Sequence, residues 1–550
     1  MKNVKKSVAC IFYVWYNVGD DRRYGDMNDN EKANYLTTFK IQIIRHIRET
    51  YTFSDTSYLS PMEIKEAIKQ LCNRAVPIAP KTFDWLRSML RFVRDKDQWL
   101  VYDNTTGLWH YEVSDNQLRA LLCDYFQAIY EAAYNAGDDI YMGYACAFFG
   151  TNKIAQLMIR LRGAVQFIEP SAAKIIERNY NIRYFDTTEG SKCIIDISKD
   201  QFNMRTVKFS ETQPMLLQAQ APVPISTTDE EPKLWLSLID EYMLHDPVKV
   251  AYFYKVLAYM MSPYNYNQVL LYWIGDHGRN GKGTIVKVLQ DILGPYATRL
   301  NSDLINANPA PSFKKDDALA STEGRSLLIF NEIDERMVAS TQSIKDLTEG
   351  GRDKFGNKIM TVVRPAYSRN YEINISGTPL IIANSLLNMG EWSNLEPIFR
   401  RLILVSFDYK IQVEDPTLLD RLAMEYPKIQ TWLYLNYFKH KGVLLKDEPA
   451  PADWQRRFDQ YINDSDIIKL FWNDCFTITN SPNDMVLRGT VYKMYTEYCK
   501  ANGRKPIKNK GTNGFAVLAR DYMQPEVILH GNVYIKGIKQ SSYYLNEVVQ

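Results

Sequence analysis

The feature that most constrains the fold of this chain is a glycine-rich segment between an apolar run and an amphipathic helix. The apolar residues LLYWI are followed by GDHGRNGKGT and then by IVKVLQDILG, in which Ile285, Val288, Leu289 and Ile292 recur at helical spacing. Glycines let backbone amides turn toward phosphate oxygens, and a helix N-terminus adds the positive end of its dipole. The order of strand, glycine-rich turn and helix therefore predicts a nucleotide-binding loop in an α/β domain.

The polar residues of this loop suit ATP and Mg²⁺, which are the predicted cofactors. Lys282 is expected to meet the β- and γ-phosphates, and Thr284 to help hold the metal ion. The usual spacing has a glycine six positions before the lysine and Ser or Thr directly after it. Here Asp276 and Gly283 occupy those places, with Gly275 and Thr284 shifted by one, so a glycine-rich turn with a surface lysine is the alternative. The predicted cofactor-binding residues are Gly275, Gly278, Asn280, Gly281, Lys282, Gly283 and Thr284.

A second apolar run, in SLLIFNEIDE, ends in acidic residues. ATP hydrolysis needs a carboxylate at the end of a neighbouring strand to position magnesium and the attacking water. Glu332 follows the apolar residues directly and is the predicted catalytic glutamate. Glu332 and Asp334 join Thr284 in the predicted metal site, with Glu335 in support. Acids that only solvate a strand end are the alternative.

Two later apolar runs carry further candidate catalytic residues. TPLIIANS ends in Asn384, which could hydrogen-bond the attacking water and the γ-phosphate, although asparagine at a strand exit is commonly a turn former. IFRRLILVSF places Arg400 and Arg401 at the start of a strand, where one could act as an arginine finger on the γ-phosphate of a neighbouring subunit. A pair of solvated surface arginines is the alternative.

The order of these elements, from Gly275 to Arg401, resembles the superfamily 3 helicases, a compact branch of the AAA+ ATPases. Within that superfamily the chain is most similar to the phage, plasmid and poxvirus primase-helicase group. NGKGT, IKDLTEGGRDKFGNK and the paired arginines follow one another as they do there, and residues 464–522 look like that group's C-terminal winged helix. The resemblance implies an ATP-dependent, ring-forming replicative DNA helicase of a phage, virus or plasmid. Such a helicase would be a homo-hexamer that moves on single-stranded DNA through a central pore.

These patterns predict a multidomain protein with an α/β AAA+ core of the doubly wound P-loop type. The apolar runs QVLLYWIG, RSLLIFNEID, TPLIIANS and RRLILVSF are typical of a buried, mostly parallel sheet. APVPISTTDEEP and LKDEPAPAD are predicted linkers because of their proline and acidic residues. The predicted domains are an α-rich N-terminal region of unassigned role at 1–95, a small α/β domain at 96–225, a linker and helical collar at 226–265, the helicase core at 266–445 and a winged-helix-like C-terminal domain at 446–550.

Two basic segments are the candidate DNA contacts. In helicases of this superfamily, a hairpin between the acidic strand and the strand ending in asparagine reaches into the pore; here that interval contains Lys354, Phe355 and Lys358, which could contact phosphate and stack on a base. Arg364 and Arg369 are weaker candidates. An ordinary basic hairpin is the alternative for this first segment. The second segment, ANGRKPIKNKGTNG, contains no acid and adds Arg504, Lys505, Lys508 and Lys510. A solvated loop is the alternative for this second segment.

Composition limits where DNA can bind and where the protein can act. The net charge is only +2, so any DNA contact must be local. The seven cysteines show no CxxC spacing and no zinc-finger pairing with histidine, which favours a reduced, cytoplasmic protein, in the host cytoplasm if the source is viral. The basic, apolar start is short and interrupted by polar residues, so we expect folded structure rather than a targeting peptide. No window has about 18 uninterrupted apolar residues, so no membrane contact is expected.

The expected partners are single-stranded and forked DNA, with a separate primase, polymerase or single-strand-binding protein as further candidates. No His-x-His pair suits a rolling-circle nickase, and IIDISKD, with Asp196 and Asp200, is the nearest approach to a primase metal site. Two competing functions stay open. One is an AAA+ origin-binding or loader ATPase without unwinding activity, and the other is a DNA-binding scaffold with a degenerate ATP site.

Overall fold

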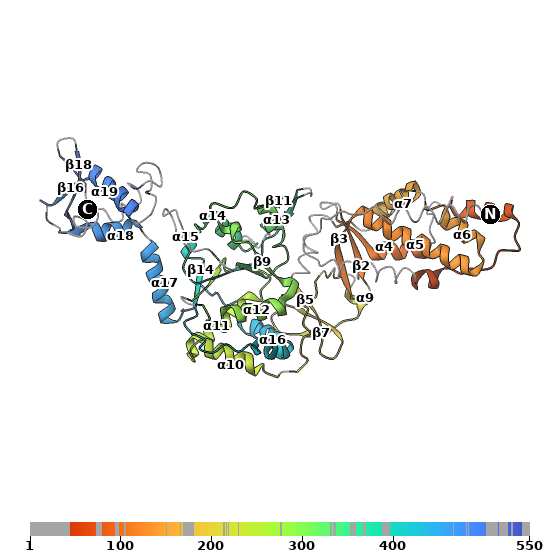
Figure 1. The fold of residues 1–550 in the computed structure, drawn as a ribbon, viewed down its shortest axis with the longest axis horizontal. Coiled ribbons are helices and arrows are strands. Elements are labelled where there is room, and N and C mark those ends of the chain that lie inside the picture. The colour runs from red at the N-terminus through yellow and green to blue at the C-terminus, as the bar shows by residue number, and fades with distance from the viewer. Residues whose placement is uncertain are drawn as a thin grey trace. The chain divides into compact units, whose positions relative to one another are not determined.

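The chain divides into two compact units, Met1–Ile168 and Glu169–Gln550 (Figure 1). The bounds of the five predicted domains stay predictions. The computed structural model describes residues 45–72, 80–93, 98–103, 106–149, 151–164, 167–168, 181–212, 215, 217, 219–228, 230–275, 278–330, 333, 337–351, 359–366, 370–387, 396–465, 467–479, 481, 483–501, 506, 515, 526–529 and 532–541.

The first unit is a small sheet with helices. β2 and β3 pair antiparallel, with Asp103 opposite Leu108. At the start of α3, the amide of Ser60 donates to the carboxylate of Glu63, and the amide of Glu63 donates to the hydroxyl of Ser60. The sheet order is β3-β2-β1-β4. The elements are α3 (Pro61–Cys72), α4 (Pro80–Met89), β1 (Leu90–Val93), β2 (Gln98–Asp103), β3 (Leu108–Val113), α5 (Asp115–Ala136), α6 (Asp139–Cys146), α7 (Thr151–Ala164) and β4 (Phe167–Ile168).

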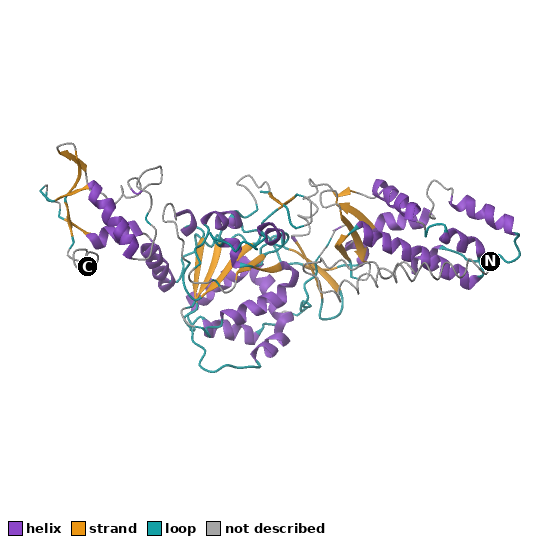
Figure 2. Ribbon diagram, turned by 45° about the horizontal axis from the view of Figure 1, so that its top comes forward, coloured by secondary structure: helices purple, strands orange, loops and turns teal. Residues whose placement is uncertain are grey.

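The second unit is built on a five-stranded sheet in which every neighbouring pair is parallel (Figure 2). The strand order is β14-β8-β13-β10-β9. The four predicted apolar runs form four of these strands, so the prediction of a buried parallel sheet is confirmed. Strands covered on both faces are continuously apolar, as β8 and β14 are here. The strands are β8 (Leu270–Ile274), β9 (Ala297–Leu300), β10 (Leu327–Phe330), β13 (Thr378–Ala383) and β14 (Leu402–Ser406).

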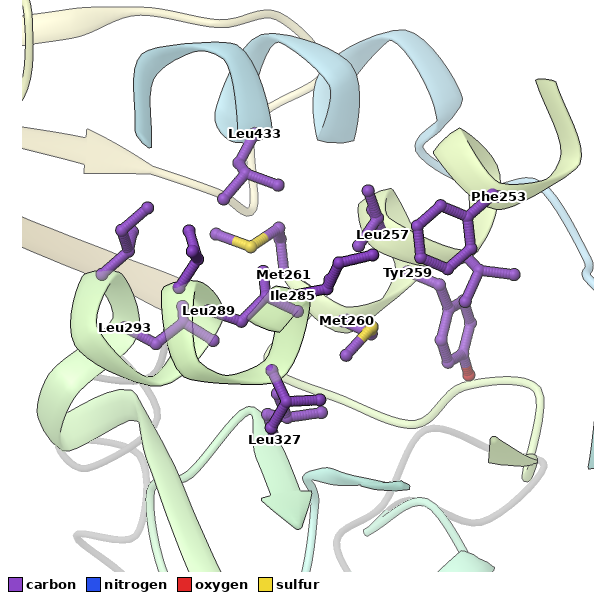
Figure 3. Packing of buried hydrophobic residues seen from close by; sticks show 14 of the residues in the cluster. Phe253, Leu257, Tyr259, Met260, Met261, Ile285, Leu289, Leu293, Leu327 and Leu433 are labelled. Atoms are coloured by element: carbon purple, nitrogen blue, oxygen red, sulfur yellow. The ribbon is translucent and has the colours of Figure 1, made fainter. Parts of the chain in front are cut away.

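Helices cover both faces of this sheet and alternate strand residues point to each face. Leu271 and Trp273 join one apolar cluster, whereas Leu270 and Tyr272 join the other. Figure 3 shows the first cluster, where Leu433 packs over the helix that follows the glycine-rich loop. The first face is covered by α10 (Lys233–Tyr242), α11 (Pro247–Met260), α12 (Lys282–Leu293) and α16 (Leu418–His440). The second face is covered by η4 (Ser302–Ile305), α13 (Lys315–Ala320), α14 (Thr341–Thr348) and α15 (Glu396–Phe399), and η3 (Gly294–Tyr296) follows α12.

Both segments predicted to be linkers pack against this core instead. Ile225 is fully buried, and its amide donates to Asp186 of a small antiparallel sheet. Leu445 is also buried, and the second segment forms ion pairs through Glu448 and Asp453. The prolines and acids of these segments surround apolar residues that complete the core, which composition alone does not reveal. The small sheet comprises β5 (Ile182–Asp186), β6 (Lys192–Asp196) and β7 (Met204–Thr206), followed by α9 (Phe209–Thr212).

A buried arginine joins the small sheet to the core. Arg183 of β5 is 1% exposed, donates to the hydroxyl of Ser326, and lies 4.3 Å from the ring centroid of Tyr296. We expect Arg183→Ala to lower the free energy of unfolding of the second unit by about 3 kcal/mol, because it empties a packed site. Urea unfolding followed by fluorescence measures this. Arg205→Ala, which removes an exposed ion pair with Glu211, is the control and should lower the free energy of unfolding by about 0.5 kcal/mol or less. Equal losses of unfolding free energy in the two variants would contradict the role of Arg183 in joining the small sheet to the core.

The C-terminal part contains helices and short antiparallel strands around its own apolar cluster. β17 and β18 pair antiparallel, with Leu529 opposite Asn532. The winged helix stays a prediction. In the part of the chain that the structure describes, no helix is long and apolar enough to cross a membrane. The elements are α17 (Ala452–Ser465), α18 (Ile467–Cys475), β15 (Phe476–Ile478), β16 (Met485–Leu487), α19 (Arg488–Ala501), β17 (Glu526–Leu529), β18 (Asn532–Lys536) and β19 (Ile538–Gln540).

Candidate nucleotide-binding site

The glycine-rich loop leaves the carboxyl end of β8, which lies between β13 and β14 in the sheet. The chain passes from β8 to the far edge of the sheet at β9 and returns through β10 and β13, before β14 adds on the opposite side of β8. Strand order therefore reverses around β8. In open α/β sheets, ligands bind outside the carboxyl ends of the strands at such a reversal. The predicted loop thus occupies the position in this sheet where a ligand is expected.

Two glycines of the loop have no room for a side chain. A Cβ on Gly275 would lie 1.9 Å from Nδ2 of Asn280 and 2.8 Å from Nζ of Lys282. Gly281 has φ of 85°, in the left-handed region, and a Cβ there would lie 2.1 Å from Cε2 of Tyr242. Gly278 and Gly283 have open space at the corresponding position. Gly275 and Gly281 therefore let the loop close tightly, which the sequence pattern alone could not assign to individual glycines.

This difference gives a matched test of the loop. We expect Gly281→Ala to weaken ATP binding at least about tenfold, because left-handed backbone and the contact with Tyr242 both disfavour a methyl group. Gly283→Ser restores the residue type of the usual motif in open space, and should change affinity by no more than about twofold. Titration with a fluorescent ATP analogue measures both. If Gly283→Ser lowers the affinity for ATP and Gly281→Ala does not, the loop does not bind ATP in the proposed way.

Lys282 and Asn384 meet at the carboxyl edge of the sheet. Lys282 is 4% exposed, and its Nζ donates to the backbone oxygen of Gly275 at 3.2 Å and to Oδ1 of Asn384 at 3.3 Å. Asn384 directly follows β13, the strand beside β8. The structure therefore brings together two residues that lie 102 positions apart in the sequence. Their catalytic roles stay predictions.

The start of α12 supplies donors for an anion. Gly281 is its N-cap and makes no side-chain cap, and Lys282, Gly283 and Thr284 form its first turn. Amide groups in the first turn of a helix have no partner inside the helix, and they carry the positive end of its dipole. Thr284 is half-buried there, and Asn280 is buried within the loop. Amides, an ammonium group and a hydroxyl thus converge as phosphate and its metal ion require.

The segment after β14 also holds the loop, which sequence reasoning missed. Arg279 has φ of 63°, unusual for a residue other than glycine, and its backbone oxygen accepts from the amide of Ile411 at 2.9 Å. Its guanidinium pairs with Glu414 at 2.9 Å. At the strand end, the amide of Phe407 donates to Ile274. No local sequence signal joins these residues, because the contacts span more than 130 positions.

Arg400 and Arg401 lie at the opposite edge of the sheet. Leu402 pairs with Leu270, whereas Ser406 pairs with Ile274, so the arginines precede the amino end of β14 while the loop follows the carboxyl end of β8. Five strand residues span about 16 Å. The arginine pair is therefore separated from the glycine-rich loop of its own chain by the length of the sheet.

A cavity of about 480 Å³ lies beside the arginine pair, between β14 and α17. Arg400, Arg401 and Lys446 line it, together with apolar residues that include Trp454 and Phe458. Burial and the neighbouring Arg400 lower the pKa of Arg401, and burial with the two arginines lowers the pKa of Lys446. The carboxylates of Glu349 and Asp447 act in the opposite direction on Arg401 and Lys446, and Glu448 also lines the cavity.

Several predicted site residues lie outside the described residues. The strand that precedes the acidic residues can still be placed, because Phe330 at the end of β10 pairs with Ile381 of β13. That strand end is therefore next to the one that leads to Asn384. Within the described ranges, no group of three or more His, Cys, Asp and Glu side chains is placed to hold a metal ion. The residues that lie outside are Glu332, Asp334, Glu335, Lys354, Phe355, Lys358, Arg369, Arg504, Lys505, Lys508 and Lys510.

A short hairpin lies between β10 and β13, in the interval where the DNA-contacting hairpin is predicted. β11 (Thr361–Val363) pairs antiparallel with β12 (Tyr371–Ile373). The predicted residues Lys354, Phe355 and Lys358 precede β11 in the sequence and lie outside the described residues. Arg364 begins the connection, where its amide donates to Asp316.

No family model and no curated protein matches this chain. Among solved structures, the apo C-terminal region of NrS-1 aligns at 12% identity and a TM-score of 0.45, over 83% of this chain and 99% of that one. A second apo structure of that region, residues 305–718, aligns at 12% identity and 0.42, over 84% and 100%. The JCV helicase with a bound phenoxyphenyl acetamide compound aligns at 12% identity and 0.20, over 50% and 66%. The strand order and the glycine-rich loop of this chain are themselves compatible with a P-loop core.

Proposed function

We propose that this protein is an ATP-dependent DNA helicase of the AAA+ superfamily 3 type, which acts as a homo-hexameric ring on single-stranded and forked DNA. The observation that carries the proposal is the meeting of Lys282 and Asn384 at the carboxyl edge of a parallel sheet. The ammonium group of a residue in α12 and the side-chain amide of a residue that follows β13 lie beside the first-turn amides of α12, and transfer of a γ-phosphate to water requires groups of these kinds.

In this proposal the residues of the site bind ATP, hold Mg²⁺ or act on the attacking water, and Glu332 does two of these. The amides of the loop and the ammonium group of Lys282 bind the phosphate chain of ATP, and Asn384 orients the attacking water. Glu332 accepts the proton of that water. Thr284, Glu332 and Asp334 supply oxygen ligands of the kind Mg²⁺ prefers. When bound, Mg²⁺ neutralises charge that develops on the phosphate oxygens.

The arginine pair would complete the site of a neighbouring subunit. Arg400 and Arg401 lie at the edge of the sheet away from their own loop, as a residue that acts across an interface must. The cavity beside them carries a third cation, Lys446. A ring in which the amino edge of one sheet faces the carboxyl edge of the next therefore pairs positive side chains with bound phosphate.

DNA would bind at the two basic segments of the sequence. Lys354, Phe355 and Lys358, which precede β11 in the sequence, would contact one strand within the ring. The second segment, at the C-terminal end, would hold DNA outside the pore through Arg504, Lys505, Lys508 and Lys510.

A fork assay tests this function. We expect the purified protein to hydrolyse ATP faster when single-stranded DNA is added, and to displace a labelled strand from forked DNA only with ATP and Mg²⁺. ATP hydrolysis without stimulation by DNA and without strand displacement would instead indicate an origin-binding or loader ATPase. Binding of DNA without any hydrolysis would indicate a scaffold with a degenerate ATP site.

A further inference from the structure

The helix α17 packs beside β14, the strand at one edge of the parallel sheet, and joins both apolar clusters of the core. Trp454, near its start, is buried in the first cluster, and Phe458, one turn later, packs against the second. Asp453 forms an ion pair with the buried Lys249 of α11 at 2.6 Å. Because these contacts hold α17 to the core, its side chains have fixed places relative to the strand ends.

Arg457 of α17 holds the turn that follows β14. Its Nη1 donates to Oγ of Ser406 at 2.7 Å and to Oδ1 of Asp408 at 3.3 Å. The hydroxyl of Ser406, which is buried, donates to the same carboxylate oxygen at 2.8 Å. Hydrogen bonds between charged partners are stronger than neutral ones. This network therefore keeps the residues that directly follow β14 in one conformation.

Phe407, between these two residues, lies against the glycine-rich loop. Its amide donates to the backbone oxygen of Ile274, at the end of β8, at 2.7 Å. Its own backbone oxygen lies 2.8 Å from the place that a Cβ on Gly275 would take. Gly275 in turn accepts from Nζ of Lys282. The turn that Arg457 holds therefore supports the backbone to which the ammonium group of the loop is bonded.

Tyr461, one helical turn after Arg457, holds the turn that follows β13. Its hydroxyl donates to the backbone oxygen of Leu387 at 2.8 Å, and both residues are buried. Leu387 is the third residue after Asn384. A shift of this turn would therefore move the side-chain amide of Asn384 relative to the loop.

We propose that α17 positions both halves of the nucleotide site, through Arg457 on the side of the glycine-rich loop and through Tyr461 on the side of Asn384. The inference rests on the proposed nucleotide site and extends it to a helix outside the segments that contain the site motifs. Arg457 and Tyr461 are positioning residues, because they act through the turns that they hold. Displacement of a catalytic group by about 1 Å can lower a rate about a hundredfold, so a smaller shift of either turn is measurable.

The test distinguishes the two turns by separating turnover from binding in the full-length protein. Tyr461→Phe removes only the hydroxyl and keeps the ring beside Phe399. We expect its turnover number for ATP hydrolysis to fall about tenfold, and its affinity for a fluorescent ATP analogue to stay within about twofold of wild type. Arg457→Met removes the donors from a side chain of similar length. We expect its affinity for the analogue to fall about fivefold, because the phosphate-binding loop loses its support.

An Asn384→Ala background distinguishes positioning from a general loss of stability. In that background Tyr461→Phe should have no further effect on the residual turnover, because the side chain that it positions is absent. Arg457→Met should still weaken binding of the analogue there. Asp459→Ala is the matched control, since Asp459 is on the exposed face of α17 and accepts from Gln455 of the same helix. It should keep the turnover and affinity of wild type, and thermal unfolding shows whether each variant is folded.

Three results would overturn the inference alone. They are unchanged turnover in a folded Tyr461→Phe protein, unchanged affinity in a folded Arg457→Met protein, and a loss from Tyr461→Phe that is as large in the Asn384→Ala background as in wild type. A wild-type protein that neither binds the analogue nor hydrolyses ATP would instead overturn the proposed function.

Discussion

Lys282→Ala is expected to lower the turnover number for ATP hydrolysis roughly 1000-fold, because it removes the charge that stabilises the phosphate oxygens in the transition state. Lys282 is buried in the first turn of α12, and its ammonium group donates to the backbone oxygen of Gly275 and to Oδ1 of Asn384. Alanine cannot replace that charge, and no rotation of a surface side chain restores it. Steady-state phosphate release, with and without single-stranded DNA, measures the loss.

Lys287→Ala is the control for this variant. It lies on the same helix, is half-exposed, and pairs with Asp291 one turn away. Such a pair contributes about 0.5 kcal/mol or less, so hydrolysis should stay near the wild-type rate. Thermal unfolding shows whether each variant keeps its fold. Unchanged hydrolysis in a folded Lys282→Ala protein would exclude the glycine-rich loop as the catalytic site.

Mixing two inactive variants is expected to restore hydrolysis if the arginine pair acts across a subunit interface. Arg401→Ala or Arg400→Ala should lose about a thousandfold in turnover, as is typical for an arginine finger. In an equal mixture with Lys282→Ala, a complete site forms where an intact loop faces an intact arginine pair, at about a quarter of the interfaces of a randomly assembled ring. Hydrolysis by the mixture, after the subunits are allowed to exchange, measures this recovery.

The mixture also shows which arginine acts and whether it acts in its own chain. The arginine whose loss is complemented by Lys282→Ala is the finger. Arg421→Ala, which removes an exposed arginine that pairs with Asp415, serves as the control and should be active by itself. Activity of the mixture no higher than the sum of its inactive components would show that the loop and the arginine pair do not combine between subunits.

Much of the parallel core could be predicted because its strands are buried on both faces. Such strands are uninterrupted apolar runs, and the glycine-rich loop marks which run is β8. The approach of Asn384 to Lys282 could also be expected, since both follow strands whose carboxyl ends share one edge. The β17–β18 hairpin has a local turn signal. Each of these features leaves a signal within a short segment, either a run of apolar residues or a recognisable motif.

Features that depend on distant contacts were not predictable in this way. Tyr242 and the residues after β14 support the loop, yet nothing in their own segments distinguishes them from ordinary core residues. The two proline- and acid-containing segments resemble linkers in composition, but Ile225 and Leu445 fill spaces in the core that only the folded chain creates. The places of these residues are set by tertiary packing, and the local sequence around each residue does not reveal them.

The contact between Ser226 and α16 has a consequence for how the nascent chain folds. The amide of Ser226 donates to Pro427, and the hydroxyl of Thr431 donates to Ser226 across 205 positions. A ribosome takes roughly 10 to 40 seconds to synthesise that length, and during this time Leu433 is not present to cover α12. The part of this core that is synthesised first is therefore covered only after α16 has been synthesised, so this core cannot close before that helix is available.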